Sequence, residues 1–329
     1  MGDPAGIGPE IIVKALRHPL VRRKVNPIVV GSLSVISQAA RLMGLEDTVK
    51  EVTDAGVEGF PPQVIPVVDI GDAQIETIEP GRKDARYGRI AVQSMESALS
   101  LVLSGQANGL VTAPICKESA HLAGFPYPGV TEFLADRCGV KETKLMLWSA
   151  PLKVIHTTGH LALKEALKRL TPSAIVRTAE LGKQVWAKVY KREPRIAVAA
   201  VNPHLGEGGA FGNDDQEIVE PAVSLLKEKG FTVFGPVPAD TVFYHARKGL
   251  YDIVVAHYHD QGHIPVKLLA FESAVNVTAG LPIVRTSPDH GVAFDIAWQN
   301  KAREGSLVRA ILLAARLAQS ERMNREVRR

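Results

Sequence analysis

The feature that most constrains the fold is a repeated alternation of short, β-branched apolar runs with longer segments of helical periodicity. The apolar runs have the length of strands and little polar alternation, which is typical of strands buried on both faces of a sheet. Candidate strands cover residues 27–30, 64–68, 109–112, 144–148, 153–156, 195–201 and 253–256. Candidate helices cover residues 9–16, 34–43, 88–103, 131–138, 161–170, 172–189, 215–229 and 306–319. This order predicts an α/β fold with a largely parallel sheet.

The length of 329 residues predicts one large domain or two closely joined domains. No internal repeat and no Gly/Ser-rich linker marks a boundary, so the order of the elements is the only guide. We place a middle domain at residues 122–271 and expect residues 1–121 and 272–329 to fold together as the other.

Composition and charge exclude several classes of protein. Hydrophobic residues make up 46% of the chain and charged residues 22%, which is the balance of an ordinary globular protein. A small anionic substrate suits the net charge of +4 as well as nucleic acid does, and no pattern of basic and aromatic residues supports nucleic acid. The two cysteines are too few for a disulfide framework, and neither a signal peptide nor a membrane-spanning run is recognisable. We therefore expect a cytoplasmic protein that binds no membrane.

The segment at residues 2–10, GDPAGIGPE, looks like a loop that leaves a strand and enters a helix, with Pro9 near the helix start. No strand precedes this loop in the sequence. Two interpretations stay open: the first strand is missing, or the loop begins the ordered chain.

Three of the ten histidines, His160, His204 and His259, each come just after a candidate strand. Ligands gather at the carboxyl ends of parallel strands, and neutral imidazoles form a Lewis-acid site for Zn²⁺, Mn²⁺ or a similar ion. A single histidine of this kind is more often a hydrogen-bonding residue, so the prediction depends on all three. His257 and His263 compete with His259 for the third place, and spacing alone does not decide between them.

Other polar residues follow the same strands. Asp260, next to His259, is a candidate general base or a carboxylate that orients the imidazole; a turn residue before Gly262 is the alternative. The glycines of residues 202–212 have the wrong spacing for a dinucleotide fingerprint, so we expect a flexible loop that shapes the site around His204. Arg285 suits a carboxylate or phosphate, although a single arginine is commonly a surface ion pair.

Together these segments closely resemble the 4-hydroxythreonine-4-phosphate dehydrogenase family of vitamin B6 biosynthesis. The resemblance runs through residues 2–10, 111–114 with Lys117, 129–133, 202–209, 238–241, 258–262, 280–287 and 289–297. Within the family, HDQGHIPVKLL at residues 259–269 and FDIAW at residues 294–298 look more like the branch that acts on D-threonate or D-erythronate 4-phosphate.

The resemblance implies a two-subdomain α/β/α fold of the isocitrate/isopropylmalate dehydrogenase type. It implies a homodimer with its active cleft at the dimer interface, an outer subdomain on the cofactor side, and a middle subdomain that carries the interface and the metal ligands. It further implies NAD or NADP and one divalent ion per site (Zn, Mn, Mg or Co). The residues that match family positions are His160, His204 and His259 for the metal, Thr131, Lys267, Asn276 and Arg285 for the substrate, and His290, Gly291 and Asp295 for the cofactor.

The function that the resemblance implies is metal-dependent, NAD(P)-linked oxidation and decarboxylation of a small phosphorylated hydroxy acid, with Asp260 and Lys117 as candidate proton-transfer residues. One departure concerns Val130, because the family usually has histidine before the threonine of its Gly-x-Thr-Glu motif. The change removes a cationic or hydrogen-bonding contact to the substrate.

Two other enzymes remain as alternatives. A decarboxylating cis-dihydrodiol dehydrogenase of the terephthalate type is slightly favoured by Val130, since a less polar contact suits a ring. A phosphate acyltransferase shares the broad architecture, but it performs no redox chemistry and needs no three converging histidines. A pure binding module leaves the polar strand exits unexplained.

Overall fold

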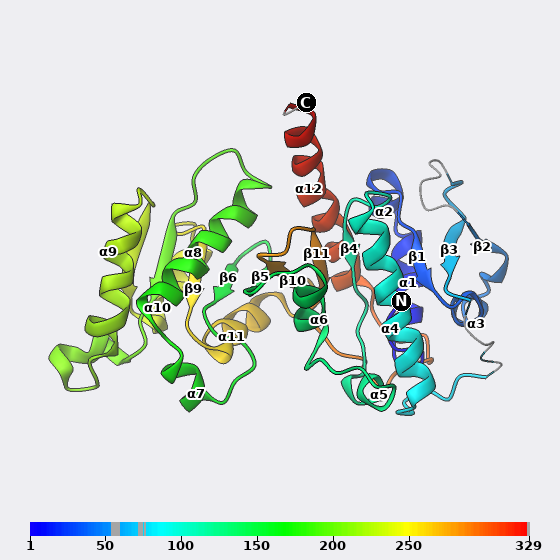
Figure 1. The fold of residues 1–329 in the computed structure, drawn as a ribbon, viewed down its shortest axis with the longest axis horizontal. Helices are drawn as coiled ribbons and strands as arrows, with labels where there is room; N and C mark the ends of the chain where they lie inside the picture. Colours follow the sequence, from blue (N-terminus) through cyan, green and yellow to red (C-terminus); the bar gives the residue numbers. More distant parts are fainter. Residues whose placement is uncertain (54–59, 72–74, 76, 328–329) are drawn as a thin grey trace. The chain divides into compact units, whose positions relative to one another are not determined.

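The fold was obtained as a computed structural model that describes residues 1–53, 60–71, 75 and 77–327 (Figure 1). Backbone contacts divide the chain into two compact units. Unit 1 consists of Met1–Lys141 and Leu281–Arg322, and the main body of unit 2 is Glu142–Gly280.

The limits of these units differ from the domain boundaries expected after residues 121 and 271. Helix α6 (Val130–Arg137) belongs to unit 1 because Phe133 and Leu134 pack in the same apolar cluster as residues of helix α4 (Ala85–Leu103). Strand β10 (Val275–Ala279) belongs to unit 2 because it pairs with strand β5 (Lys144–Trp148). The assignment of a cofactor side and an interface side to the two domains stays a prediction.

Unit 1 contains two sets of parallel strands. Strands β1 (Val29–Gly31), β3 (Ile65–Asp69) and β2 (Val49–Glu51) form a sheet in that spatial order, and β4 (Leu110–Val111) pairs with β11 (Arg285–Pro288). The helical elements are α1 (Gly8–Arg17), α2 (Pro19–Lys24), α3 (Leu33–Arg41), the short η1 (Glu46–Thr48), α4, α5 (Lys117–Leu122), α6 and α12 (Gly305–Val327). Residues 1–7, ahead of α1, contain no helix or strand.

Unit 2 is built on one sheet with the spatial order β10-β5-β6-β9-β7-β8. Strands β6 (Lys153–His156), β9 (Ile253–Ala256), β7 (Ile196–Ala199) and β8 (Val233–Val237) run parallel, whereas β5 is antiparallel to both of its neighbours. The helical elements are α7 (Leu163–Lys168), α8 (Pro172–Ala187), η2 (Pro203–Gly209), η3 (Asp215–Val219), α9 (Glu220–Glu228), α10 (Ala239–Arg247) and α11 (His259–Ala270). The expected α/β fold with a largely parallel sheet is confirmed.

The strands that the sequence located best are mostly apolar runs. β5, β6 and β9 have the predicted bounds, and every residue of β9 is buried. β8 and β11 were not predicted, since the first contains Gly235 and Pro236 and the second reads Arg-Thr-Ser-Pro. Their pairing partners, not their own composition, make them strands.

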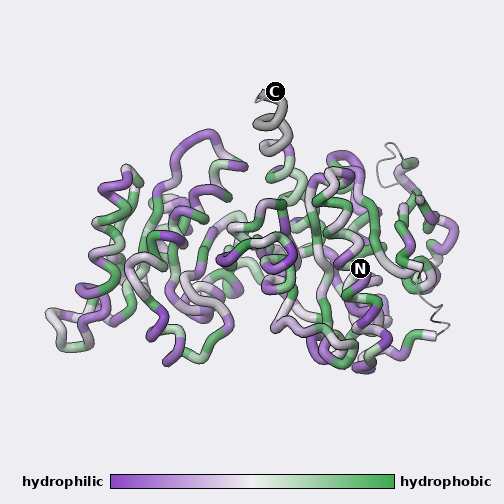
Figure 2. The backbone as a smooth tube through the Cα atoms, viewed as in Figure 1, coloured by the Kyte–Doolittle hydropathy of each residue, from purple (hydrophilic) through white to green (hydrophobic). Residues whose placement is uncertain are grey.

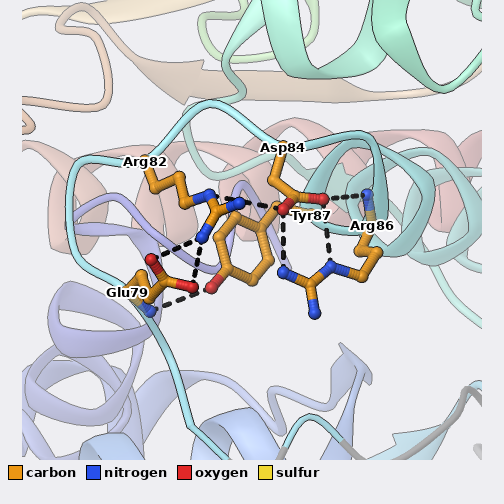
Figure 3. Close-up of polar contacts among 5 residues, drawn as sticks. All are labelled: Glu79, Arg82, Asp84, Arg86 and Tyr87. Carbon is orange, nitrogen blue, oxygen red and sulfur yellow. Dashed lines mark hydrogen bonds and ion pairs between the residues drawn. The ribbon is translucent and has the colours of Figure 1, made fainter.

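Side-chain caps fix where several helices begin. Ser32 accepts a hydrogen bond from Val35 at the start of α3, and Thr171 accepts one from Ala174 at the start of α8. At the start of α4, Asp84 accepts a 2.8 Å hydrogen bond from the backbone N–H of Arg86, and Figure 3 shows the side chain of Arg86 on the same carboxylate. The Arg86 hydrogen bonds lower the pKa of Asp84 to about 2, so this cap stays ionised.

Each unit buries its own apolar core. In unit 1, α1 and α3 pack on the β1–β3 sheet through residues such as Ile11, Ile36 and Ile65, none of which is exposed. In unit 2, Val154, Val254 and Ala197 bury one face of the sheet. Figure 2 shows hydrophobic and hydrophilic residues together along the helices, as expected for helices that bury one face. Among the helices described, none combines the length and the apolar character needed to cross a bilayer.

We predict that Gly88→Ala destabilises the protein. Gly88 lies where α4 packs on α5, and a Cβ atom added there would stand 1.9 Å from the carbonyl oxygen of Ser119. The clash is expected to cost more than the roughly 1 kcal/mol that alanine gains in a helix, for a net loss of about 1–3 kcal/mol in the free energy of unfolding. Urea unfolding followed by circular dichroism measures the loss. The control is Gly291→Ala, whose added Cβ would have no neighbour within 4 Å; equal stability of the two variants would contradict the packing argument.

Candidate active site

Two of the predicted metal-ligand histidines, His160 and His259, lie together in unit 2. His160 follows β6 and His259 follows β9, two adjacent parallel strands whose exits are joined by a 2.7 Å hydrogen bond from the N–H of Thr157 to the carbonyl of Ala256. The centroids of the two imidazole rings are 5.1 Å apart. His160 and His259 are far apart in the sequence, but the parallel pairing of β6 and β9 brings them together at the carboxyl ends of these strands.

The imidazole of His259 is held from two sides. Its Nδ1 lies 2.6 Å from a carboxylate oxygen of Asp260, and its ring stacks on His263 with 3.6 Å between centroids and 11° between planes. The hydrogen bond to His259 lowers the pKa of Asp260, so the carboxylate is ionised and Nδ1–H donates to it. That tautomer leaves Nε2 of His259 as a lone-pair donor. Asp260 lies in the first turn of α11, so its alternative interpretation as a turn residue is wrong.

A row of imidazoles continues inward from His259. His263 lies between His259 and His156, whose ring centroid is 4.7 Å from that of His263. His156 is 1% exposed and its Nδ1 lies 3.2 Å from the carbonyl oxygen of Leu145. Burial lowers the pKa of His156 to about 3 and that of His263 to about 4, so both rings are neutral at neutral pH. A Cβ atom on Gly262 would meet Nε2 of His156 at 2.3 Å, so only glycine lets α11 approach this ring.

His257, one of the competitors for the third ligand position, points elsewhere. Its Nε2 lies 2.6 Å from the carbonyl oxygen of Ala199 in β7, and the residue is 1% exposed. Gln261 completes the connection, because it accepts from the N–H of His257 and donates to the carbonyl of Ala200. The side chain of His257 thus fastens β9 to β7 within the sheet.

His204 lies on an unusual turn after β7. Residues His204, Leu205 and Glu207 have φ values of 51°, 60° and 42°, a left-handed conformation that costs energy in residues other than glycine. The turn leaves β7 at a fixed angle because Asp215, fully buried, accepts hydrogen bonds from the N–H groups of Val201 and Asn202. The segment expected as a flexible loop contains this left-handed turn, and the helical segment that follows starts at Asp215, close to the expected position.

The three histidines do not form one cluster within a single chain. His204 is exposed, and the ring that it contacts is Phe211 at 6.4 Å. Within the part of the chain that the structure describes, no three His, Cys, Asp or Glu side chains are arranged to hold a metal ion. One chain therefore supplies a pair of imidazoles at one place and a third imidazole at another.

Lys267 and Asn276, two of the predicted substrate-binding residues, also belong to unit 2. Lys267 lies one helical turn after His263 on α11, and its positive charge contributes to the lowered pKa of His263 after burial and His259. Asn276 lies in β10, and its buried Oδ1 accepts no hydrogen bond from any residue described. An amide oxygen in this state is suited to accept a hydrogen bond from a ligand.

The other two predicted substrate-binding residues, Thr131 and Arg285, belong to unit 1. Thr131 is in the first turn of α6, where backbone N–H groups and the helix dipole favour an anion. Arg285 is 5% exposed and donates a 2.7 Å hydrogen bond to Thr112. Burial lowers its pKa to about 10, which still leaves the guanidinium charged at neutral pH. Nζ of Lys117 lies 3.7 Å from where a Cβ of Gly129 would be, so a second cation stands beside the start of α6.

The predicted cofactor residues His290, Gly291 and Asp295 lie in a segment of bends and turns after β11. Nδ1 of His290 is 3.1 Å from the carbonyl oxygen of Gly291, and Asp295 accepts at its backbone carbonyl from Gln299. No contact described here distinguishes these three as cofactor ligands, so that role stays a prediction.

Sequence reasoning missed the residue that fixes this segment, Glu10. Its fully buried carboxylate accepts hydrogen bonds from the N–H groups of Trp298 (2.5 Å) and Asn300 (2.7 Å). Both donor residues have positive φ, a backbone conformation that is unfavourable for residues other than glycine. The hydrogen bonds to the carboxylate stabilise this turn. A carboxylate on the apolar face of α1 was the available signal, because such a group is buried only with partners.

The fold and these strand-exit clusters define the class to which the chain belongs: α/β proteins with polar side chains at the carboxyl ends of parallel strands, which is where ligands bind in sheets of this kind. A family model described as "Pyridoxal phosphate biosynthetic protein PdxA" matches residues 23–314. The chain belongs to this family of enzymes, as the resemblance implied.

Similar proteins agree with this assignment. The chain is 44% identical over 326 residues to D-threonate 4-phosphate dehydrogenase of Salmonella typhimurium, with 97% of each protein covered. The structure of 4-hydroxythreonine-4-phosphate dehydrogenase from Klebsiella pneumoniae matches with a TM-score of 0.86 at 42% identity, covering 97% of this chain and 98% of that one. A terephthalate 1,2-cis-dihydrodiol dehydrogenase from Burkholderia xenovorans matches with a TM-score of 0.66 at 33% identity, covering 96% of each. These dehydrogenase structures confirm the fold type that the resemblance implied.

We predict that Glu10→Gln destabilises the segment that carries the predicted cofactor residues. Glutamine offers one acceptor oxygen where two N–H groups need partners, so one buried donor is lost at a cost of about 1–3 kcal/mol. Hydrogen exchange at Trp298 and Asn300 should accelerate, and the urea midpoint should fall. The control is Glu46→Gln, a substitution of an exposed glutamate in unit 1. Unchanged exchange at both amides would show that the carboxylate does not hold the turn.

Proposed function

We propose that the chain is a metal-dependent, NAD(P)-linked dehydrogenase that oxidises and decarboxylates a small phosphorylated hydroxy acid, with D-threonate 4-phosphate as the first candidate. The observation that carries the proposal is the His160–His259 pair at adjacent strand exits, with His259 oriented by Asp260. This pair occurs in a chain that is 44% identical to a D-threonate 4-phosphate dehydrogenase.

The residues present fit a divalent ion. Two imidazoles with centroids 5.1 Å apart can turn nitrogens toward one ion, and the Asp260 carboxylate fixes the tautomer of His259 that a metal requires. His204 is the proposed third ligand. Because its position within one chain is separate from the pair, we propose that two subunits of a homodimer share the ligand set. Nitrogen ligands suit Zn²⁺, Mn²⁺ or Co²⁺, and Mg²⁺ less well.

The bound ion would supply Lewis acidity toward the hydroxyl that is oxidised. Asp260 accepts the hydroxyl proton, directly or through water, while the carbon gives hydride to the nicotinamide of NAD or NADP. The product ketone is β to a carboxylate, so carbon dioxide leaves with the electrons of the broken bond directed into the ketone. Lys117 returns a proton to the resulting carbanion equivalent. His290, Gly291 and Asp295 are the proposed cofactor contacts.

Substrate binding is assigned to Thr131, Lys267, Asn276 and Arg285. A buried guanidinium and the N-terminus of α6 suit a phosphate or carboxylate, and the open amide oxygen of Asn276 suits a hydroxyl. Structural similarity favours a phosphorylated acid over a terephthalate dihydrodiol, since the TM-score is 0.86 for the 4-hydroxythreonine-4-phosphate dehydrogenase and 0.66 for the dihydrodiol dehydrogenase.

Val130 supports the D-threonate branch within the family. Its side chain packs against the apolar cluster formed by Phe125, Phe133 and Leu134, so it offers the substrate no polar contact. D-Threonate 4-phosphate carries an uncharged hydroxyl where 4-hydroxythreonine 4-phosphate carries an ammonium group, and an uncharged hydroxyl loses less when it faces an apolar side chain. The proposed setting is the cytoplasm, where such phosphorylated metabolites occur.

We predict that metal-stripped protein reduces NAD or NADP with D-threonate 4-phosphate only after Zn²⁺, Mn²⁺, Co²⁺ or Mg²⁺ is restored. Nicotinamide absorbance gives the rate, and trapped carbon dioxide gives the decarboxylation. D-Erythronate 4-phosphate, 4-hydroxythreonine 4-phosphate and terephthalate dihydrodiol are compared under the same conditions.

The control for this assay is His204→Ala, which should lose more than about 100-fold in rate, because it removes a metal ligand, while remaining a folded dimer. Turnover of the dihydrodiol alone would replace the proposed substrate class. Near-normal turnover by His204→Ala would refute the proposed ligand set.

We predict that His263 positions His259 for metal binding. His263→Ala removes the stacked ring and should weaken zinc affinity about 10-fold, the low end for residues that orient ligands. His263→Phe keeps a flat ring in place and should retain affinity within about threefold of the starting protein, on the same reasoning. Competition with a chromogenic chelator measures affinity without reference to turnover. Equal losses in both variants would show that stacking is not the support.

A further inference from the structure

His156 connects the two segments that carry the proposed metal-binding pair, His160 and His259. It is the last residue of β6, and His160 follows four residues later in the same strand exit. The buried ring of His156 lies 4.7 Å from that of His263, which stacks in turn on His259 at the start of α11. One side chain thus links the strand exit of His160 to the helix of His259.

The ring of His156 is held in one orientation. Its Nδ1 lies 3.2 Å from the carbonyl oxygen of Leu145 in β5, and a carbonyl can only accept, so Nδ1 carries the hydrogen of the neutral ring. Nε2 therefore has a lone pair and no hydrogen. Among the residues that the structure describes, none forms a hydrogen bond with this buried nitrogen. Burying a polar atom without a partner is unfavourable, so packing alone does not explain a histidine at this position.

The Nε2 edge of His156 faces α11. A Cβ atom added at Gly262 would stand 2.3 Å from Nε2 of His156 and 2.7 Å from Cγ1 of Val154, so the helix backbone already lies against the ring. A phenylalanine ring would be larger and would place a C–H group at this edge, and overpacking of this kind pushes neighbouring elements apart. A histidine with its hydrogen on Nδ1 is therefore a thin, fixed spacer between β6 and α11.

We propose that His156 is a positioning residue that sets the separation of His160 and His259. It acts through its contact with the backbone at Gly262 and through the ring of His263. That the separation serves metal binding rests on the proposed function, whereas the separation itself does not. An ion binds two imidazoles only if both nitrogens reach it at about 2.0–2.1 Å, and a displacement of about 0.5 Å is enough to weaken such a site.

The direct test measures the separation in metal-free protein. A nuclear Overhauser effect between the imidazole protons of His160 and His259 should be present in the starting protein, whose ring centroids are 5.1 Å apart. The cross-peak should be lost in His156→Ala, which removes the spacer, and in Gly262→Ala, which pushes the helix away from the ring. A cross-peak that persists in either variant would overturn the proposal.

Ile155→Ala is the matched control for a general loosening of the strand. Ile155 precedes His156 in β6 and is fully buried, but its side chain points to α8, where a Cβ atom on Gly182 would stand 3.3 Å from Cγ2 of Ile155. Its truncation should destabilise the protein and leave the cross-peak in place. A cross-peak lost equally in Ile155→Ala and His156→Ala would mean that the ring has no specific role, which contradicts the proposal.

Zinc affinity, measured with a chromogenic chelator, tests the consequence for the proposed metal site. His156→Ala and Gly262→Ala should each weaken the affinity about 10-fold, the low end for groups that orient ligands, and Ile155→Ala should not. The double variant of His156 and Gly262 should lose less than the product of the two single losses, because removal of the ring makes room for the added methyl group. Losses that multiply would show that the two residues do not act through their contact, and would overturn the proposed route.

The two measurements separate this inference from the proposed function. A starting protein that shows the cross-peak, loses it in His156→Ala and yet binds no zinc would refute the metal site and support the spacing role of His156. Unchanged zinc affinity in a variant that has lost the cross-peak would instead overturn the link between the separation and metal binding.

Discussion

The constraint on which the rest of the structure depends is that backbone N–H and C=O groups at the buried strand exits must find partners. Where the chain leaves a strand it can no longer use the sheet ladder, so single buried side chains take over. Asp215 accepts from the two N–H groups after β7, and Gln261 joins the exits of β9 and β7. Glu10 does the same for the turn at residues 298–300. Asp215, Gln261 and Glu10 therefore fix the backbone of the segments that carry the candidate functional side chains.

The same constraint explains why the imidazoles differ in character. His257 and His156 are buried and each lies within hydrogen-bond distance of a backbone carbonyl, so their role is structural and burial keeps them neutral. His259 lies two residues beyond His257, the last buried residue of this strand exit, and takes its orientation from Asp260 and His263. His257 and His259 are only two residues apart, yet His257 links two strands of the sheet, whereas His259 is placed to bind a ligand.

Much of the fold and part of the site followed from sequence patterns. Strands β5, β6 and β9 were predicted with their observed bounds because their residues are mostly apolar, and His160 and His259 were predicted together because both follow such strands. Strands β8 and β11 were not predicted, because Gly, Pro and polar residues become strands only through their neighbours. The left-handed turn at His204 was expected as a flexible loop, since no local pattern specifies three non-glycine residues with positive φ.

The sequence by itself determined the class of fold, the family and the identity of the candidate ligand residues, because hydrophobic periodicity and unusual motifs are local properties of the chain. Only the tertiary structure decided which histidine faces which neighbour. His257 and His259 lie two residues apart with similar surroundings in sequence, yet Ala199, brought alongside by strand pairing, sits 2.6 Å from one of them and not from the other.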